Sequence, residues 1–152
     1  MAVIESPATV VETIAIKAPI AAVFAALTVP EQLVQWWGSE DGYRVTTMEA
    51  DVRPGGAWKT TGKSGDGGTF TVAGNYRTID PPRLVEFTWR HDWADGSDEP
   101  ETLVRYELAE RGGVTDLTVT HSGFTTVADR EDHARGWKIV LAWVREFFTT
   151  RA

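Results

Sequence analysis

Two histidines and two tyrosines are the residues of this chain whose types and positions suit acid–base chemistry. His91 and His121 each fall near the end of a predicted strand, on the face expected to point inward, so the two imidazoles can meet. Such a pair could orient a ligand carbonyl or act as general acid and base near neutral pH. The alternative, which we favour, is that each is a hydrogen-bonded histidine at the margin of the core, with His121 stabilising the turn into Ser122.

Tyr76 and Tyr106 bring phenol groups to the same predicted inner surface. A buried phenol hydroxyl usually finds a hydrogen-bond partner, which can be a ligand or, more commonly, a backbone carbonyl. His91, His121 and Tyr106 are therefore the candidate catalytic residues, although no spacing motif supports any of them.

The sequence does not indicate a metal site or an activated nucleophile. Glu49 or His133 could be proposed as a third metal ligand beside the two histidines, but neither has the spacing of a metal motif. Ser122 follows His121 directly and lacks the surroundings of a nucleophile elbow. The chain has no cysteine, which excludes disulfides, thiolate zinc sites and a cysteine nucleophile. We expect no metal and no other cofactor.

The elements that must position these groups are a series of strands closed by one long helix. Six runs alternate between apolar and polar residues, at 44–52, 56–62, 68–79, 84–92, 102–109 and 114–121. The short glycine and proline turns between them predict an antiparallel meander. Residues 10–17 add a first strand, and Pro19 and Pro30 open two short helices after it.

The helix expected over residues 128–150 carries a broad apolar stripe. Its members at helical spacing are Trp137, Val140, Leu141, Val144 and Phe148, with His133 one turn earlier. So apolar a helix must lie against a large surface, which the curved sheet supplies. The sequence therefore predicts an α+β helix-grip fold, with about seven antiparallel strands wrapped around the C-terminal helix. Gly74 and Gly136 would either create ligand space between helix and sheet or allow their close approach.

A cavity between sheet and helix would have a mostly aromatic lining. The predicted ligand-binding residues are Trp36, Trp37, Phe70, Tyr76, Phe87, Trp89, His91, Tyr106, His121, Phe124, Trp137 and Leu141. An apolar surface with a few polar groups is typical of a small-molecule pocket, and equally of a packed core. Trp36 and Trp37 could form a lid, but adjacent helical residues point about 100° apart, so at most one faces the cavity directly.

Composition sets limits on location and partners. The 152 residues suit one domain over 9–152, preceded by a flexible lead-in at 1–8. A net charge of −7 opposes binding to nucleic acid or to an anionic membrane. No signal peptide and no apolar run of membrane-spanning length is evident, so we expect a cytoplasmic protein. Trp143 and Phe147 could pack on the short helices or form a homodimer contact.

Several local motifs, taken in order, resemble a known family. They are the segments 51–56 (DVRPGG) and 79–84 (IDPPRL), the run 121–124 (HSGF) and the pair 136–137 (GW). Together with the order of the elements, they resemble the START-like (SRPBCC) helix-grip superfamily. Within it, they are similar to the polyketide cyclase-like family of homologues of the activator of heat-shock protein 90 ATPase.

The resemblance implies a cavity between the sheet and the C-terminal helix that binds a small hydrophobic or aromatic ligand. Relatives in the superfamily bind lipids, sterols, hormones or polyketides, and some catalyse cyclisation. We therefore favour a binding domain over an enzyme, with a cyclase- or hydrolase-like enzyme on a hydrophobic carbonyl substrate as the alternative. A chaperone-interacting stress-response protein is the third hypothesis. The chain has no room for the N-terminal domain with which the eukaryotic activator docks, so we do not expect chaperone contact.

Overall fold

The structure is a computed structural model that describes residues 9–38, 44–64, 68–92 and 101–149. The side chains of His91 and Asp92 are not described. The predicted lead-in at residues 1–8 lies outside the described residues.

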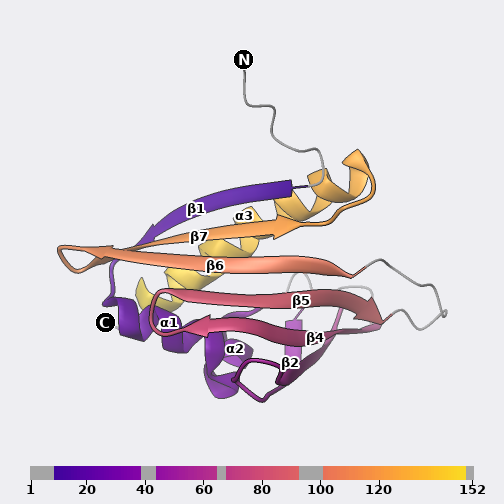
Figure 1. Ribbon diagram of the computed structural model, residues 1–152, viewed down its shortest axis with the longest axis horizontal. Helices are drawn as coiled ribbons and strands as arrows, with labels where there is room; N and C mark the ends of the chain where they lie inside the picture. The colour runs from indigo at the N-terminus through magenta and orange to yellow at the C-terminus, as the bar shows by residue number, and fades with distance from the viewer. Residues whose placement is uncertain (1–8, 39–43, 65–67, 93–100, 150–152) are drawn as a thin grey trace.

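One seven-stranded antiparallel sheet forms the body of the molecule, in the order β1-β7-β6-β5-β4-β3-β2 (Figure 1). The strands are β1 (Thr9–Ile16), β2 (Arg44–Ala50), β3 (Ala57–Lys63), β4 (Thr69–Asp80), β5 (Leu84–Asp92), β6 (Thr102–Arg111) and β7 (Val114–Ser122). From β2 to β7, neighbours in sequence are neighbours in the sheet, as short turns require. β1 pairs with β7 along its whole length. The predicted fold class is confirmed.

The alternation of side chains in the strands explains why one face of the sheet is apolar. In β7, Leu117, Val119 and His121 are buried while the residues between them are partly exposed. In β5 the alternation is interrupted at Thr88, which is also buried. Its hydroxyl accepts a hydrogen bond from the backbone N–H of Asn75 at 2.8 Å, so it replaces a backbone partner between β4 and β5.

Three helices cover the inner face. α1 (Ile20–Thr28) and α2 (Pro30–Trp36) follow β1, and α3 (Val127–Thr149) crosses the sheet behind β7 and β6 (Figure 1). Trp137, Val140, Leu141, Val144 and Phe147 of α3 are buried, whereas Phe148 is only partly so. Among the described residues, no helix is long and apolar enough to cross a membrane.

Contacts at the start of α3 fix its position. The hydroxyl of Thr126 accepts a hydrogen bond from the backbone N–H of Asp129 at 3.1 Å, which satisfies one unpaired donor of the first turn. The guanidinium of Arg130 donates to the carbonyl of Thr9 at 2.8 Å and thereby ties the helix to β1. The N-terminal half of α3 is thus held at the edge of the sheet.

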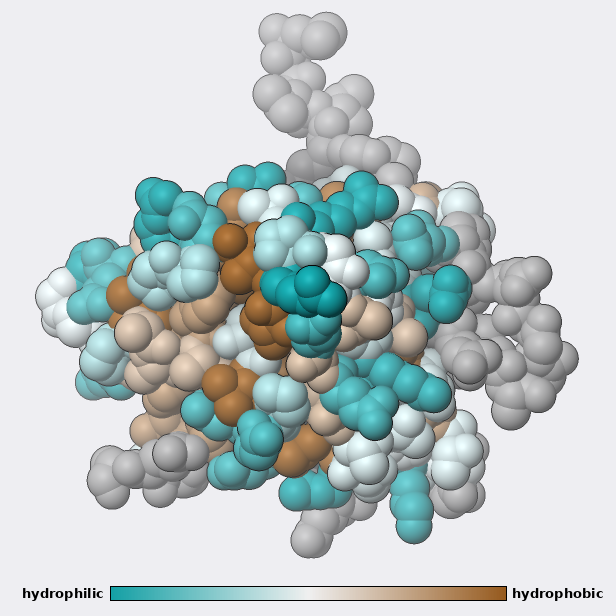
Figure 2. Space-filling view, turned by 60° about the horizontal axis from the view of Figure 1, so that its bottom comes forward, coloured by the Kyte–Doolittle hydropathy of each residue, from teal (hydrophilic) through white to brown (hydrophobic). Residues whose placement is uncertain are grey.

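The outer surface has no single dominant apolar area on the face shown in Figure 2, where hydrophobic residues form small areas separated by hydrophilic ones. Trp143 is partly buried against the core and Phe147 is buried. Both aromatics therefore pack mainly within the chain, and the homodimer stays a prediction.

Gly74 allows β4 and β5 to approach closely and does not create ligand space. A Cβ at this position would lie 1.9 Å from the carbonyl oxygen of Thr88, an oxygen that also accepts a hydrogen bond from the Trp58 indole at 3.1 Å. We expect Gly74→Ala to lower the free energy of unfolding by about 2–3 kcal/mol, because the backbone must shift to relieve the clash. Urea unfolding measures this difference.

Gly136→Ala is the matched control for that substitution. No atom lies within 4 Å of the Cβ it would add. Alanine in a helix is more stable than glycine by about 1 kcal/mol, so this variant should be as stable as the wild type or more so. A Gly74→Ala variant that equals the wild type in stability would contradict the assigned packing.

Candidate functional site

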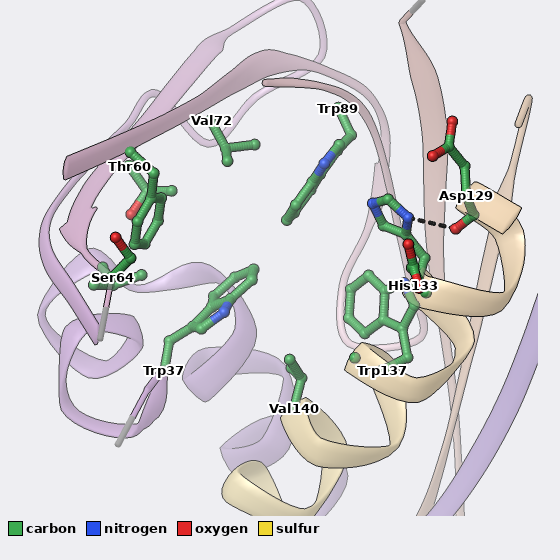
Figure 3. A pocket seen from close by; sticks show the side chains of 13 residues that line it. Trp37, Thr60, Ser64, Val72, Trp89, Asp129, His133, Trp137 and Val140 are labelled. Carbon is green, nitrogen blue, oxygen red and sulfur yellow. Dashed lines mark hydrogen bonds between the residues drawn. The ribbon is translucent and has the colours of Figure 1, made fainter. Parts of the chain in front are cut away.

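A cavity of about 460 Å³ lies between the sheet and α3 (Figure 3). Its wall is formed by strands β2 to β5, by the residues that follow α2 and β3, and by residues 129–140 of α3. The lining residues are Trp37, Val45, Thr60, Ser64, Phe70, Val72, Trp89, Asp129, Asp132, His133, Gly136, Trp137 and Val140. Aromatic and aliphatic side chains thus make most of the wall, with polar groups at the β3 side and at the start of α3.

Three tryptophans form most of the aromatic part of the wall, which also includes Phe70. The ring centroids of Trp37 and Trp89 are 5.9 Å apart, and those of Trp89 and Trp137 are 6.2 Å apart. Trp36 stacks on Trp37 at 5.1 Å, but its own indole N–H donates to the carbonyl of Ala26 at 2.8 Å. Trp36 therefore anchors α2 to α1 and Trp37 faces the cavity.

His121 holds two of these tryptophans through a chain of hydrogen bonds. The indole N–H of Trp137 donates to His121 Nδ1 at 3.0 Å, and His121 Nε2 lies 2.7 Å from the hydroxyl of Thr102. An indole N–H can only donate, so Nδ1 accepts and Nε2 carries the proton of a neutral ring. The Thr102 hydroxyl in turn donates to the carbonyl of Trp89 at 3.2 Å. With no exposed surface, His121 acts as an internal support of the wall.

His133 is the histidine that lines the cavity. Its Nδ1 lies 2.8 Å from the backbone carbonyl of Asp129, so Nδ1 carries the proton and Nε2 is the acceptor of the neutral ring. Figure 3 shows the ring between Asp129 and Trp89. Its centroid lies 5.2 Å from that of His121 and 4.6 Å from that of Phe124.

The structure places the predicted ligand-binding residues in two groups. Those that line the cavity are Trp37, Phe70, Trp89 and Trp137. Those that are buried without lining it are Trp36, Tyr76, Phe87, Tyr106, His121, Phe124 and Leu141. His91 pairs with Val72 in the sheet, but its side chain lies outside the described residues. Among the candidate catalytic residues, neither His121 nor Tyr106 is brought to the cavity wall, because both pack under α3.

The predicted set of ligand-binding residues does not include nine of the lining residues. The predicted inner face and helical stripe contain Val72, His133, Gly136 and Val140. The alternation of the strands and the spacing along the helix could therefore have identified these four residues. Val45, Thr60 and Ser64 belong to or follow strands with weak alternation. Asp129 and Asp132 carried no signal, because charged residues at a helix start are usually solvated.

Gly136 is where the lining lacks a side chain altogether. A Cβ built there meets no atom within 4 Å, so the absent side chain leaves open space next to Trp137. Of the two explanations that the sequence left open for this glycine, the geometry excludes a close approach of helix and sheet.

Burial raises the pKa of the Tyr76 phenol from 10.0 to about 12. The unfolded chain then releases this proton near pH 10, while the folded chain holds it to about pH 12. Stability is therefore complete below pH 10 and falls as the pH rises from 10 to 12, by about 1.4 kcal/mol per pH unit. We expect Tyr76→Phe to remove this contribution to the loss of stability at alkaline pH. Urea unfolding of the wild type and the variant at pH 9 and pH 11 measures the difference. If both proteins lost the same free energy of unfolding between pH 9 and pH 11, this role of Tyr76 would be contradicted.

The site carries negative charge. Asp129 and Asp132 are its charged residues, and no lysine or arginine occurs among the lining residues that the structure describes. Asp132 also contacts Arg135, which lies outside the lining. No group of three His, Cys, Asp or Glu residues in the described part of the chain could hold a metal ion.

Residues 17–148 match the family model described as Activator of Hsp90 ATPase homolog 1-like protein. The chain belongs to this family. As a member of the Activator of Hsp90 ATPase homolog 1-like family, it shares the START-like helix-grip fold. No curated protein matches it.

Several solved structures share the fold of this Activator of Hsp90 ATPase homolog 1-like protein. The AHSA1 protein from Silicibacter pomeroyi is 24% identical with a TM-score of 0.83, over 95% of this chain and 100% of that one. A protein from Chromobacterium violaceum is 24% identical with a TM-score of 0.82, over 94% and 98%. CalU16 from Micromonospora echinospora is 21% identical with a TM-score of 0.72, over 92% and 75%. At these identities the similarity concerns the fold alone.

Proposed function

We propose that this domain binds a small, largely apolar or aromatic molecule in the cavity between the sheet and α3. The cavity of about 460 Å³ falls within the roughly 300–1,000 Å³ of small-molecule sites. Its wall combines three tryptophans with a small number of polar groups, which would orient the ligand.

The single observation that carries this proposal is the open space at Gly136. Glycine in a helix interior costs about 1 kcal/mol relative to alanine. Here the missing side chain gives no close contact between helix and sheet, since no atom lies within 4 Å of the Cβ position. The open space therefore supports an occupant other than the protein's own side chains.

A panel of apolar molecules tests the proposal. It includes 1-naphthylmethanol, a fatty acid and a sterol, each incubated with the protein and examined by native mass spectrometry and thermal unfolding. A ligand at ~100 times its Kd adds about 2.7 kcal/mol of stability, which raises Tm by roughly 5–10 °C. No bound species and no shift across the panel would overturn the proposal.

Catalysis on a hydrophobic carbonyl substrate has less support. A general acid or base must come within hydrogen-bond reach of the substrate. His121 and Tyr106 are buried without lining the cavity, and both ring nitrogens of His121 bond within the protein. The chaperone hypothesis rests on the name of the family alone.

A further inference from the structure

At Thr60 and Trp137 the cavity wall directs its polar hydrogens at the protein, which favours a ligand that donates hydrogen bonds there. This inference rests on the proposed function and concerns the class of ligand. The hydroxyl of Thr60 donates to the carbonyl of Thr47 at 2.9 Å, so its oxygen presents lone pairs to any further partner. The indole N–H of Trp137 is likewise directed at His121 and not at the cavity.

His133 extends the same pattern to the other side of the cavity. Because its Nδ1 donates to the carbonyl of Asp129, the neutral ring has its acceptor at Nε2, whichever group that nitrogen meets. Figure 3 shows this ring turned between Asp129 and the Trp89 wall.

Charge in the wall favours a cation over an anion. Asp129 and Asp132 stand in the first two turns of α3, and the described lining holds no lysine or arginine to oppose them. The lining also contains Trp37, Trp89 and Ser64, which are polar but add no charge. A ligand carboxylate would therefore enter without a counter-charge, whereas an ammonium group gains from the aspartates and from the indole faces.

The dipole of α3 acts in the opposite direction but is weaker. A helix N-terminus carries roughly half of a positive charge, which attracts anions. Two aspartate side chains carry a full negative charge each, and both lie at this same end of the helix. The sum over the lining residues at this end of α3 is negative even with Asp132 in contact with Arg135 outside the lining.

We infer that the ligand of this cavity is an aromatic or cyclic amine, whose ring lies among Trp37, Trp89 and Trp137 and whose ammonium group lies at the α3 end of the cavity, on the side of His133 and the two aspartates. The ring supplies the apolar contact, and the ammonium supplies both donors and charge. A carboxylate of the same size and shape is selected against.

Three naphthalene derivatives of similar shape separate the contribution of the ring to the affinity from those of charge and hydrogen bonding. Isothermal titration calorimetry with the full chain at pH 7 compares 1-naphthylmethylamine, 1-naphthylmethanol and 1-naphthylacetate. We expect the amine to bind roughly ten times more tightly than the carboxylate, with the alcohol between them. The preference should shrink as salt is added, because exposed carboxylates are screened.

Charge-neutral variants assign the preference to the named residues. Asp129→Asn combined with Asp132→Asn should weaken binding of the amine roughly three- to tenfold and change that of the alcohol less than twofold. Glu131→Gln is the matched control, because Glu131 is exposed on the same turn of α3 and does not line the cavity. It removes the same charge and should leave the amine affinity within about twofold.

The outcomes separate this inference from the proposed function. Binding of the alcohol together with equal or tighter binding of the carboxylate would overturn the amine assignment and leave the proposed function standing. Equal loss of amine affinity in Glu131→Gln and in the double variant would overturn the role of the two lining aspartates. Failure of all three compounds to bind would overturn the inference, and it would overturn the proposed function as well only if the fatty acid and the sterol of the wider panel also fail to bind.

Discussion

Gly136→Phe is expected to weaken binding of 1-naphthylmethanol at least a hundredfold while the protein stays folded. The phenylalanine ring would enter the space next to Trp137, where no atom beyond the adjacent residues and backbone of α3 lies within 4 Å of the Cβ position. Phenylalanine is also a better helix former than glycine, so the substitution does not weaken α3. A hundredfold loss corresponds to about 2.7 kcal/mol of binding free energy. Isothermal titration calorimetry measures the affinity, and thermal unfolding measures the stability.

Two further variants make the result specific to the cavity. Ile139→Phe places the same side chain at a position of α3 that is 53% exposed and does not line the cavity, so binding should be unchanged. Gly136→Ala adds one methyl group and should weaken binding far less than phenylalanine does. Undiminished binding to Gly136→Phe would mean that the ligand occupies another part of the molecule.

His121→Leu is expected to lower the free energy of unfolding by about 3 kcal/mol and to disturb the cavity wall. The substitution removes the acceptor of the Trp137 indole N–H and the partner of the Thr102 hydroxyl in a fully buried place. Each buried polar group left without a partner costs about 1–3 kcal/mol. Urea unfolding gives the loss in stability.

A double-mutant cycle shows whether the loss comes from the hydrogen bond to Trp137. In a Trp137→Phe background the indole donor is already absent, so His121→Leu should cost about 1 kcal/mol less than it does in the wild type. His121→Asn, whose side-chain oxygen can still accept from the indole, should be more stable than His121→Leu. Equal stability of the two His121 variants, together with an additive cycle, would show that the ring acts only by packing.

The architecture could be predicted because it depends on patterns that are local in sequence. Alternation in the strands, glycine and proline at the turns and the apolar stripe of α3 each follow from burial on one face. The run 114–121 alternates as a strand with one buried face, and Leu117, Val119 and His121 are indeed buried on one face of β7. Thr88 departs from the alternation because its hydroxyl bonds to the backbone of β4, a pairing that depends on register and not on residue type.

The cavity could be predicted less well because its wall depends on distances between elements. Parity selects the inner face of the sheet but does not separate Trp89, which lines the cavity, from Phe87, which lies in the packed core. His121 and His133 both appeared on apolar faces. Which of them reaches the cavity depends on the position of α3 along the sheet, which the bond between Arg130 and Thr9 helps to fix.

A crystal structure of the protein soaked with 1-naphthylmethanol tests most directly whether the space between sheet and helix accepts a guest molecule. We expect electron density for the naphthalene ring among Trp37, Trp89 and Trp137, next to Gly136, with the backbone of α3 unmoved. A cavity closed by inward movement of these tryptophans, with no density for the compound, would contradict the account.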